Sequence, residues 1–208
     1  KEDGSVVTWG SELTGGDSTA VSNQLKDGVV NIYSTGYAFA ALKKDGSIVT
    51  WGHDPSFTGS DINDGISTEK ASALSNGVYK VTSNYSAFAA LKEDGSVITW
   101  GSSRSGGNSS SDGYNSLGVS DQKLDEGVKD IFSTHSAFAA LKTDGSIVTW
   151  GHSFEGGDSS SVANQLESGV TKVFSNNASF AALKENGSVV TWGEKDSGYG
   201  YALNQNIG

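Results

Sequence analysis

The sequence predicts an all-β fold built from repeated antiparallel units, and three observations support this prediction. First, the stretch LKKDGSIVTWG at 42–52 recurs with small changes at 91–101, 141–151 and 183–193, and a truncated copy opens the chain at 1–10. Second, aromatic and β-branched residues cluster at a regular spacing, although only 35% of the 208 residues are hydrophobic. Third, helical periodicity is absent throughout the chain.

The repeat sets the organisation of the chain. All five tryptophans end copies of the same motif: Trp9, Trp51, Trp100, Trp150 and Trp192. Their separations of 42, 49, 50 and 42 residues indicate a solenoid or a propeller. We therefore expect a single repeat domain, 1–208, with a partial unit at 1–10, full units at about 11–52, 53–101, 102–151 and 152–193, and the start of a further unit at 194–208.

Each full unit reads as three consecutive strands. In the first full unit these are VVNIYS at 29–34, AFAALK at 38–43 and SIVTW at 47–51. In the second strand, an alternating pattern places Ala38 and Leu42 on one face and Phe39 on the other. Both faces are largely apolar, so we expect this strand to be buried on both sides by neighbouring sheets.

An Asp-Gly pair, or Asn-Gly in the last copy, joins the second strand to the third. This dipeptide is the strongest short-range hairpin signal, because the tight turn needs residues that tolerate positive φ. The expected turn glycines are Gly46, Gly95, Gly145 and Gly187. Three strands per unit at this spacing predict a β-propeller, or an arc of one, with antiparallel blades of three to four strands. A parallel β-helix has shorter rungs without internal Asp-Gly hairpins and is the weaker alternative.

The repeated pattern GVxx[IV], AFAALK and DGS[IV][VI]TWG resembles the repeat of the regulator of chromosome condensation family over essentially the whole chain. The resemblance implies a propeller, commonly of seven blades with one shared blade. The family often has Gly at the end of the first strand, where this chain has Thr35, Asn84, Thr134 and Asn176. In these departures the repeats look more like those of large bacterial surface or secreted proteins. No functional residue of any one member is matched.

Charge and composition limit the classes of function. The formal net charge of −10 disfavours nucleic-acid binding. The absence of cysteine excludes disulfides and thiolate chemistry. No apolar run is long enough to span a bilayer, and no signal peptide is visible.

The chain has no methionine and begins inside a hairpin, so we expect it to be part of a longer polypeptide. A small ring of four or five blades, closed by the N-terminal strand, is the alternative. An open arc would expose apolar sheet faces.

The tryptophans have two interpretations. An indole face suits a sugar or a cation. A residue in the same place in every unit, however, more often serves the architecture, so we expect the five tryptophans to pack between blades.

The Gly-Gly loops after each Trp-Gly are candidates for a weak Ca²⁺ site at Asp17 and Asp158. One carboxylate per loop is a poor donor set, and an Asx-type turn is the preferred interpretation. His53, His135 and His152 form no recognisable metal triad and are expected to be surface residues. No catalytic motif is present, so we predict neither enzymatic activity nor a resident cofactor.

Candidate contact residues lie in the least repetitive loops: Phe57 and Asp61 in the second linker, Arg104 and Tyr114 in the third, and Tyr37, Tyr85 and His135 at one variable position between strands. We expect a binding or adhesive module at the cell surface or outside the cell, with a protein or glycan partner. Two alternatives remain open. One is a structural building block of a surface layer or filament that assembles with copies of itself. The other is an enzyme or metal-binding propeller.

Overall fold

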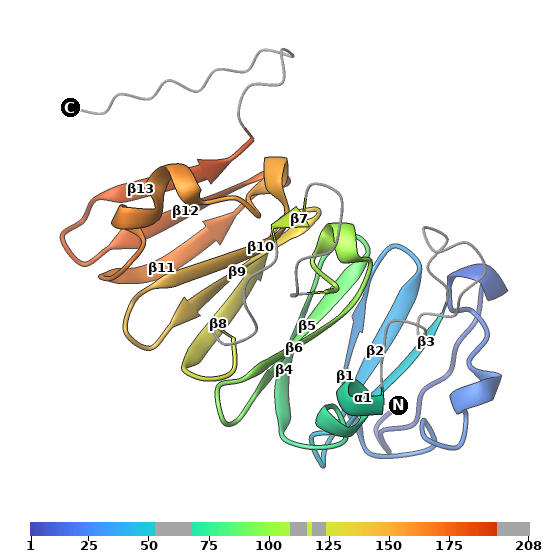
Figure 1. Ribbon diagram of the computed structural model, residues 1–208. Helices are drawn as coiled ribbons and strands as arrows, with labels where there is room; N and C mark the ends of the chain where they lie inside the picture. The colour runs from blue at the N-terminus through green and yellow to red at the C-terminus, as the bar shows by residue number, and fades with distance from the viewer. Residues whose placement is uncertain (53–67, 109–115, 118–123, 195–208) are drawn as a thin grey trace.

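The computed structural model describes residues 1–52, 68–108, 116–117 and 124–194, and within them the chain forms four antiparallel sheets side by side (Figure 1). We call the sheets blades 1 to 4. Blade 1 contains β1 (Val29–Ser34), β2 (Ala38–Lys43) and β3 (Ile48–Gly52). Blade 2 contains β4 (Val78–Ser83), β5 (Ala87–Lys92) and β6 (Val97–Gly101). Blade 3 contains β7 (Ser116–Leu117), β8 (Val128–Ser133), β9 (Ala137–Lys142) and β10 (Ile147–His152). Blade 4 contains β11 (Val170–Ser175), β12 (Ser179–Lys184) and β13 (Val189–Gly193).

The predicted hairpins are present in all four blades. In blade 1, Asp45 Oδ1 accepts hydrogen bonds from the Ser47 backbone N–H at 3.0 Å and from Ser47 Oγ at 2.6 Å. Gly46 has a φ of 77°, in the left-handed region that favours glycine. Two hydrogen bonds lower the pKa of the Asp45 carboxyl. The bond from the Ser47 side chain has the larger effect, and the bond from the Ser47 backbone N–H has the smaller one. The turn residues therefore fix the register of β2 against β3.

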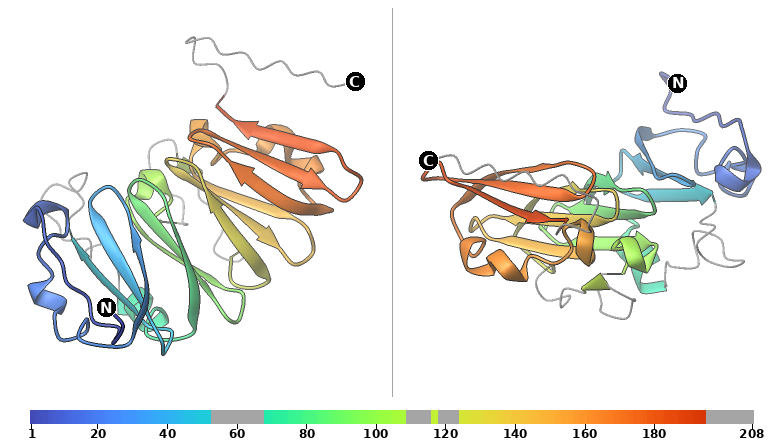
Figure 2. Two further views of the ribbon diagram at one scale, coloured as in Figure 1. Left: turned by 180° about the vertical axis from the view of Figure 1, so that it is seen from behind. Right: turned by 90° about the horizontal axis from the view of Figure 1, so that it is seen from above.

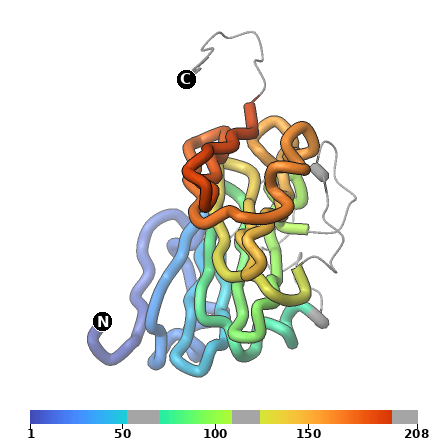
Figure 3. The backbone as a smooth tube through the Cα atoms, turned by 90° about the vertical axis from the view of Figure 1, so that its left-hand side faces the viewer, coloured from blue at the N-terminus to red at the C-terminus, as the bar shows by residue number. Residues whose placement is uncertain are grey.

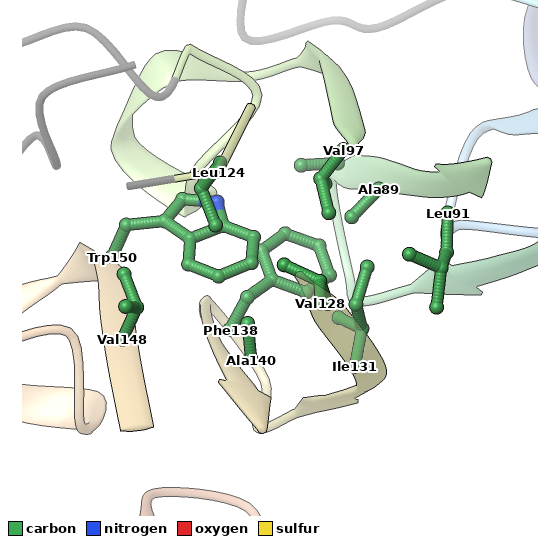
Figure 4. Close-up of a cluster of buried hydrophobic side chains, with 11 residues drawn as sticks. Ala89, Leu91, Val97, Leu124, Val128, Ile131, Phe138, Ala140, Val148 and Trp150 are labelled. Atoms are coloured by element: carbon green, nitrogen blue, oxygen red, sulfur yellow. The ribbon is translucent and has the colours of Figure 1, made fainter. Parts of the chain in front are cut away.

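The second strands of the two inner blades, β5 and β9, are buried on both faces, as the alternation predicts. We call the face toward the next blade the forward face and the opposite one the rear face. On the forward face of β2, Ala38 and Leu42 pack in one cluster with Val81 of blade 2. On the rear face, Ala41 packs with Trp51. The interface between blades 2 and 3 repeats this arrangement, with Phe138 and Trp150 at its centre (Figure 4).

The first strands of successive blades lie next to one another, so the blades fan out into an arc (Figure 2). Between blades 2 and 3, Lys80 forms an ion pair with Asp130. Thr82 Oγ1 donates to the Ile131 carbonyl at 3.2 Å, and Ser133 Oγ donates to the Ser83 carbonyl at 2.9 Å. These side-chain bonds connect strands that belong to different sheets.

The connections contain short helices. In the described part of the chain, the 3-10 helices are η1 (Glu12–Thr14), η2 (Thr19–Val21), η4 (Ser103–Ser105), η6 (Ser153–Glu155) and η7 (Ser160–Gln165). One α-helix, α1 (Thr68–Ala73), corrects the expectation that helix is absent throughout. Its six residues are too few to leave a periodic pattern in the sequence. Within the described ranges, no helix has the length and apolar character needed to cross a membrane.

Candidate binding site on the loops between first and second strands

A polar side chain builds the turn between the first and second strands of every blade. It occupies the position where the resembled family often has Gly. In blade 2, Asn84 Oδ1 accepts hydrogen bonds from the backbone N–H groups of Ser86 at 3.1 Å and Ala87 at 2.8 Å. Thr35, Thr134 and Asn176 accept equivalent bonds in the other blades. Asn and Thr side chains stabilise such turns without any need for a positive φ.

Successive turns are joined by backbone hydrogen bonds. The Gly36 N–H donates to the Tyr85 carbonyl at 2.8 Å, and the Tyr85 N–H donates to the His135 carbonyl at 3.0 Å. The His135 N–H in turn donates to the Asn177 carbonyl at 2.8 Å. These bonds form a ladder across all four blades and hold the loop residues at fixed positions.

The ladder brings three of the predicted contact residues together, and we call Tyr37, Tyr85 and His135 the aromatic row. The hydroxyls of Tyr37 and Tyr85 are 2.7 Å apart and hydrogen-bonded. Their rings meet edge to face, with centroids 5.5 Å apart. The Tyr85 ring stacks on the His135 imidazole at 4.6 Å, with an angle of 18° between the planes. Tyr85 remains 44% exposed. The row is therefore a continuous aromatic surface over blades 1 to 3.

An acidic residue lies beside the row. His135 Nδ1 is 2.9 Å from Ser136 Oγ and 3.6 Å from Glu155 Oε2. The Glu155 Oε2 atom is buried and has no hydrogen-bond partner among the described residues. Because this oxygen is buried, it lies behind the row and is not part of its exposed surface.

The 3-10 helices after the third strands are attached to the same loops. Asn84 Nδ2 donates to the Ser105 carbonyl at 2.7 Å, and Thr134 Oγ1 donates to the Glu155 carbonyl at 2.8 Å. The first bond attaches η4, and with it the exposed Arg104, to the Tyr85 loop. The second attaches η6 to the His135 loop.

The structure describes only some of the other predicted residues. Phe57, Asp61, Tyr114 and His53 lie outside the described residues. The His152 ring is 5.9 Å from that of Phe154, and its Nδ1 is buried without a partner in the described part of the chain. Sequence reasoning missed Phe154, which is 58% exposed, and the half-buried Glu155. A signal was present, because Phe154 and Arg104 both stand four residues after the tryptophan of their unit.

Four of the five tryptophans are buried, Trp100, Trp150 and Trp192 between successive blades and Trp51 on the rear face of blade 1 against Leu25. Trp51, Trp100, Trp150 and Trp192 are each stacked on a phenylalanine of the second strand in their own blade. The Trp150 Nε1–H donates to the carbonyl of Gly106, in the loop after the preceding tryptophan, at 3.2 Å. Gly15 and Gly156 accept the same bond from Trp51 and Trp192. The corresponding loop for Trp100 falls at 53–67, outside the described residues.

Trp9 departs from the expected packing, since it is 83% exposed. No second strand lies beside residues 5–9 among the described residues, so Trp9 has no phenylalanine ring on which to stack. The motif alone does not bury its tryptophan.

The candidate Ca²⁺ loops use their carboxylates in turns. Asp17 Oδ1 accepts hydrogen bonds from the Thr19 N–H at 2.8 Å and from Thr19 Oγ1 at 2.5 Å. These two hydrogen bonds lower the pKa of the Asp17 carboxyl, and the bond from the Thr19 side chain has the larger effect. Asp158 Oδ1 accepts the Ser160 N–H at 2.8 Å. Over the described ranges, no three His, Cys, Asp or Glu residues lie together in a way that could hold a metal ion.

Comparisons with known proteins were informative for the fold. No protein-family model matches the sequence, and no curated protein matches it. Among solved structures, the chain is similar to yeast RCC1 (Prp20), solved in complex with Kap60, with a TM-score of 0.50 and 17% sequence identity. It is similar to human WBSCR16, with a TM-score of 0.50 and 16% identity.

The chain has the fold of RCC1-like β-propellers. The matches cover 79% of this chain but only 42% of yeast RCC1 and 47% of WBSCR16. The chain therefore spans less than half the length of either protein. At this level of identity the likeness concerns the arrangement of the blades, and it carries no information about partners.

Proposed function

We propose that this chain is a non-catalytic binding module of a larger extracellular or cell-surface protein, and that it contacts a protein or glycan partner through its strand-connecting loops. Its repeats resemble those of the regulator of chromosome condensation family as used in large bacterial surface or secreted proteins. The net charge of −10 favours neutral or basic partners over phosphate-rich ones.

The aromatic row is the observation that carries this proposal. Aromatic faces bind the apolar faces of sugar rings and the side chains of protein partners, and exposed aromatic residues provide much of the binding energy at interfaces. Tyr37, Tyr85 and His135 come from three different blades and still form one surface. A row of this kind presents several adjacent contact points to an extended ligand.

The row is also organised before any ligand binds. The turn at Asn84 is held by three side-chain hydrogen bonds, two accepted from the backbone and one donated to Ser105. The backbone ladder fixes the neighbouring loops. Binding to a surface that is already ordered loses little conformational entropy, which favours affinity. Loops on a rigid scaffold commonly carry the contact residues of binding proteins.

The proposal is tested with Tyr85→Ala and a matched control, Tyr79→Ala. Tyr79 is 49% exposed and Tyr85 44%, so both variants remove a similar exposed ring. Tyr79, however, lies at the other end of the strand, beside the Asp-Gly turn of blade 1. A glycan array and a pull-down from cell-surface extract would be carried out with the wild type and both variants.

We expect a ligand of the wild type to lose at least tenfold in affinity with Tyr85→Ala and to be unaffected by Tyr79→Ala, since loss of a central aromatic contact costs about 2 kcal/mol or more. A ligand that binds Tyr85→Ala as well as the wild type would contradict a role for the row.

A further inference from the structure

One residue is exposed in the turn between the first and second strands of each inner blade. Tyr85 is the one exposed residue between 81 and 92, and His135 is the one exposed residue between 131 and 142. The units follow one another in chain order along the arc, so blades 2 and 3 each have a blade on both sides (Figure 3). The exposure of these two side chains therefore belongs to a repeated position in the interior of the arc.

A second exposed position lies in the 3-10 helix that follows the third strand. Arg104 of η4 is the one exposed residue between 101 and 108, and Phe154 of η6 is the one exposed residue between 151 and 158. The two helices begin with the same backbone shape, because the residue before η4 has a φ of −59° and a ψ of 124°, and the residue before η6 has −64° and 122°. The two side chains therefore leave equivalent places in their units.

Close packing holds both helices on their blades. A Cβ atom on Gly107 would lie 2.2 Å from the Gly101 carbonyl oxygen, and a Cβ atom on Gly157 would lie 2.3 Å from the Gly151 carbonyl oxygen. The second glycine of each Gly-Gly loop is thus required where the chain passes directly over the end of the third strand. The side-chain bonds described above attach each helix to the loop of its own blade. The backbone beneath the exposed positions is therefore fixed.

Each inner blade presents a pair of side chains from this fixed backbone. Blade 2 has Tyr85 and Arg104, and blade 3 has His135 and Phe154; we call Arg104 and Phe154 the outer pair. Tyr85 is 44% exposed and Phe154 is 58% exposed. Tyrosine and arginine often dominate the binding energy at protein interfaces, and phenylalanine is enriched there. Although the chain has 24 acidic residues, none occupies these four positions.

The guanidinium of the outer pair indicates one feature of the partner. Arg104 is the only arginine in a chain of net charge −10, and it forms no ion pair within the described ranges. Its planar fork of N–H donors matches the two oxygens of a carboxylate. Charges more than about 8 Å away are largely screened at physiological ionic strength, so the guanidinium has more influence than the net charge on the group that binds beside it. The outer pair is therefore suited to a carboxylate with an apolar neighbour.

The polar groups of the aromatic row favour a protein over a glycan. The hydroxyls of Tyr37 and Tyr85 are bonded to each other, and His135 Nδ1 is bonded to Ser136 Oγ. The backbone groups of the ladder are paired as well. A sugar has a hydroxyl on most of its ring carbons and loses binding energy wherever one of them gives up water without a new partner. Apolar protein side chains need no such partners.

We propose that the outer pair and the aromatic row together bind a protein segment in which one carboxylate is flanked by apolar side chains. The carboxylate pairs with Arg104, and the apolar side chains pack on Tyr85 and Phe154. This inference rests on the proposed function and names the class of partner and the residues that select it. A partner that is neutral or basic overall still fits, provided that it presents such a segment.

The probe for the test is a phage-displayed library of short random peptides, selected on the immobilised 208-residue chain. Enriched peptides are synthesised, and their affinities are measured with the wild type and with variants. Arg104→Gln and Phe154→Ala are the test variants. Lys129→Gln and Tyr79→Ala are matched controls, because they remove an exposed cation and an exposed ring from the starts of β8 and β4, at the opposite end of the first strands.

We expect the enriched peptides to contain an aspartate or glutamate between apolar residues. Their affinity is expected to fall about tenfold or more with either test variant and to stay unchanged with either control. Arg104→Glu is expected to lose such a peptide and to bind it again when lysine replaces the acidic residue of the peptide. Recovery by charge exchange would also show that the variant is folded.

Three results would overturn the inference, and they separate it from the proposed function. Peptides that need Tyr85 but bind Arg104→Gln and Phe154→Ala as well as the wild type would leave the aromatic row as the site and remove the outer pair from it. A glycan that is lost with Tyr85→Ala, with no peptide that binds this face, would leave the proposed function and overturn the class of partner. The absence of any peptide or glycan that depends on Tyr85 would contradict both.

Discussion

Trp9 and Trp150 stand at the end of the same motif and have opposite environments. Trp150 is fully buried, stacked 5.3 Å from Phe138, and bonded through Nε1 to the Gly106 carbonyl. Trp9 is 83% exposed, and no aromatic ring among the described residues stacks on it. The difference lies in the second strand, which supplies Phe138 to Trp150, whereas the described residues place no second strand beside Trp9. A tryptophan of this motif is buried where its hairpin supplies a stacking phenylalanine and the preceding Gly-Gly loop supplies a carbonyl that accepts its Nε1–H.

The largest expected effect separates these two tryptophans. Trp150→Ala should lower the free energy of unfolding by about 3–5 kcal/mol, because it leaves a cavity between two blades. Trp9→Ala should change it by less than about 0.5 kcal/mol, as is usual for an exposed side chain. Urea unfolding of both variants at a concentration where the chain is monomeric measures the two values. Equal losses would contradict the contrast between the interior and the end of the arc.

The turn glycines provide a second contrast between interior and end. A Cβ atom on Gly145 would lie 2.9 Å from the Gly169 backbone nitrogen in the next blade, whereas a Cβ atom on Gly187 would meet nothing within 4 Å. Both residues have a positive φ, 77° and 83°, so alanine at either costs roughly 1–2 kcal/mol. We expect Gly145→Ala to cost more than Gly187→Ala, because only the former also disturbs a blade interface. Thermal melts of both variants would show the order, and the reverse order would refute the explanation.

The smallest effect concerns the turn carboxylates. In blades 1 to 3, the serine two residues after each turn aspartate lowers the pKa of that carboxyl by hydrogen bonding, its side chain having a larger effect than its backbone N–H. The carboxyls are those of Asp45, Asp94 and Asp144. A carboxylate with a lowered folded-state pKa stabilises the fold at neutral pH, and this contribution is lost as the pH falls from about 4 through the folded pKa.

Blade 4 contains the natural control for this prediction. Asn186 accepts the same two bonds from Ser188, at 3.0 and 2.7 Å, and does not titrate. The triple variant Asp45→Asn/Asp94→Asn/Asp144→Asn should keep its turns and lose less stability than the wild type between pH 5 and pH 3. Melting curves across this range measure the difference. Parallel pH profiles for both proteins would show that the turn carboxylates contribute nothing.

The strands and turns of each blade could be predicted from the sequence, because the patterns that indicate them involve only neighbouring residues. The alternation around Phe39 and the Asp-Gly pair at Gly46 depend on neighbouring residues only, and they predicted strands, faces and turns. The exposure of Trp9 was not predictable from its motif, since burial depends on a phenylalanine from a paired second strand, and none of the described residues provides that strand for residues 4–10. Helix α1 was missed because Thr68–Ala73 is too short to show periodicity.

The candidate site was predicted only in part. Tyr37, Tyr85 and His135 were chosen because they vary at one loop position, but their stacking depends on the spacing between blades, which no pattern in the sequence records. Glu155 was missed because it lies in a different loop, which only the folded arc brings to His135.

The most direct measurement of the central claim is hydrogen exchange at the five indole Nε1–H groups, followed by NMR on the monomer. The account predicts slow exchange at Trp51, Trp100, Trp150 and Trp192, which are buried between or against blades, and exchange close to that of a free indole at Trp9. Protection of Trp9 equal to that of Trp150 in the monomer, or fast exchange at Trp150, would contradict it.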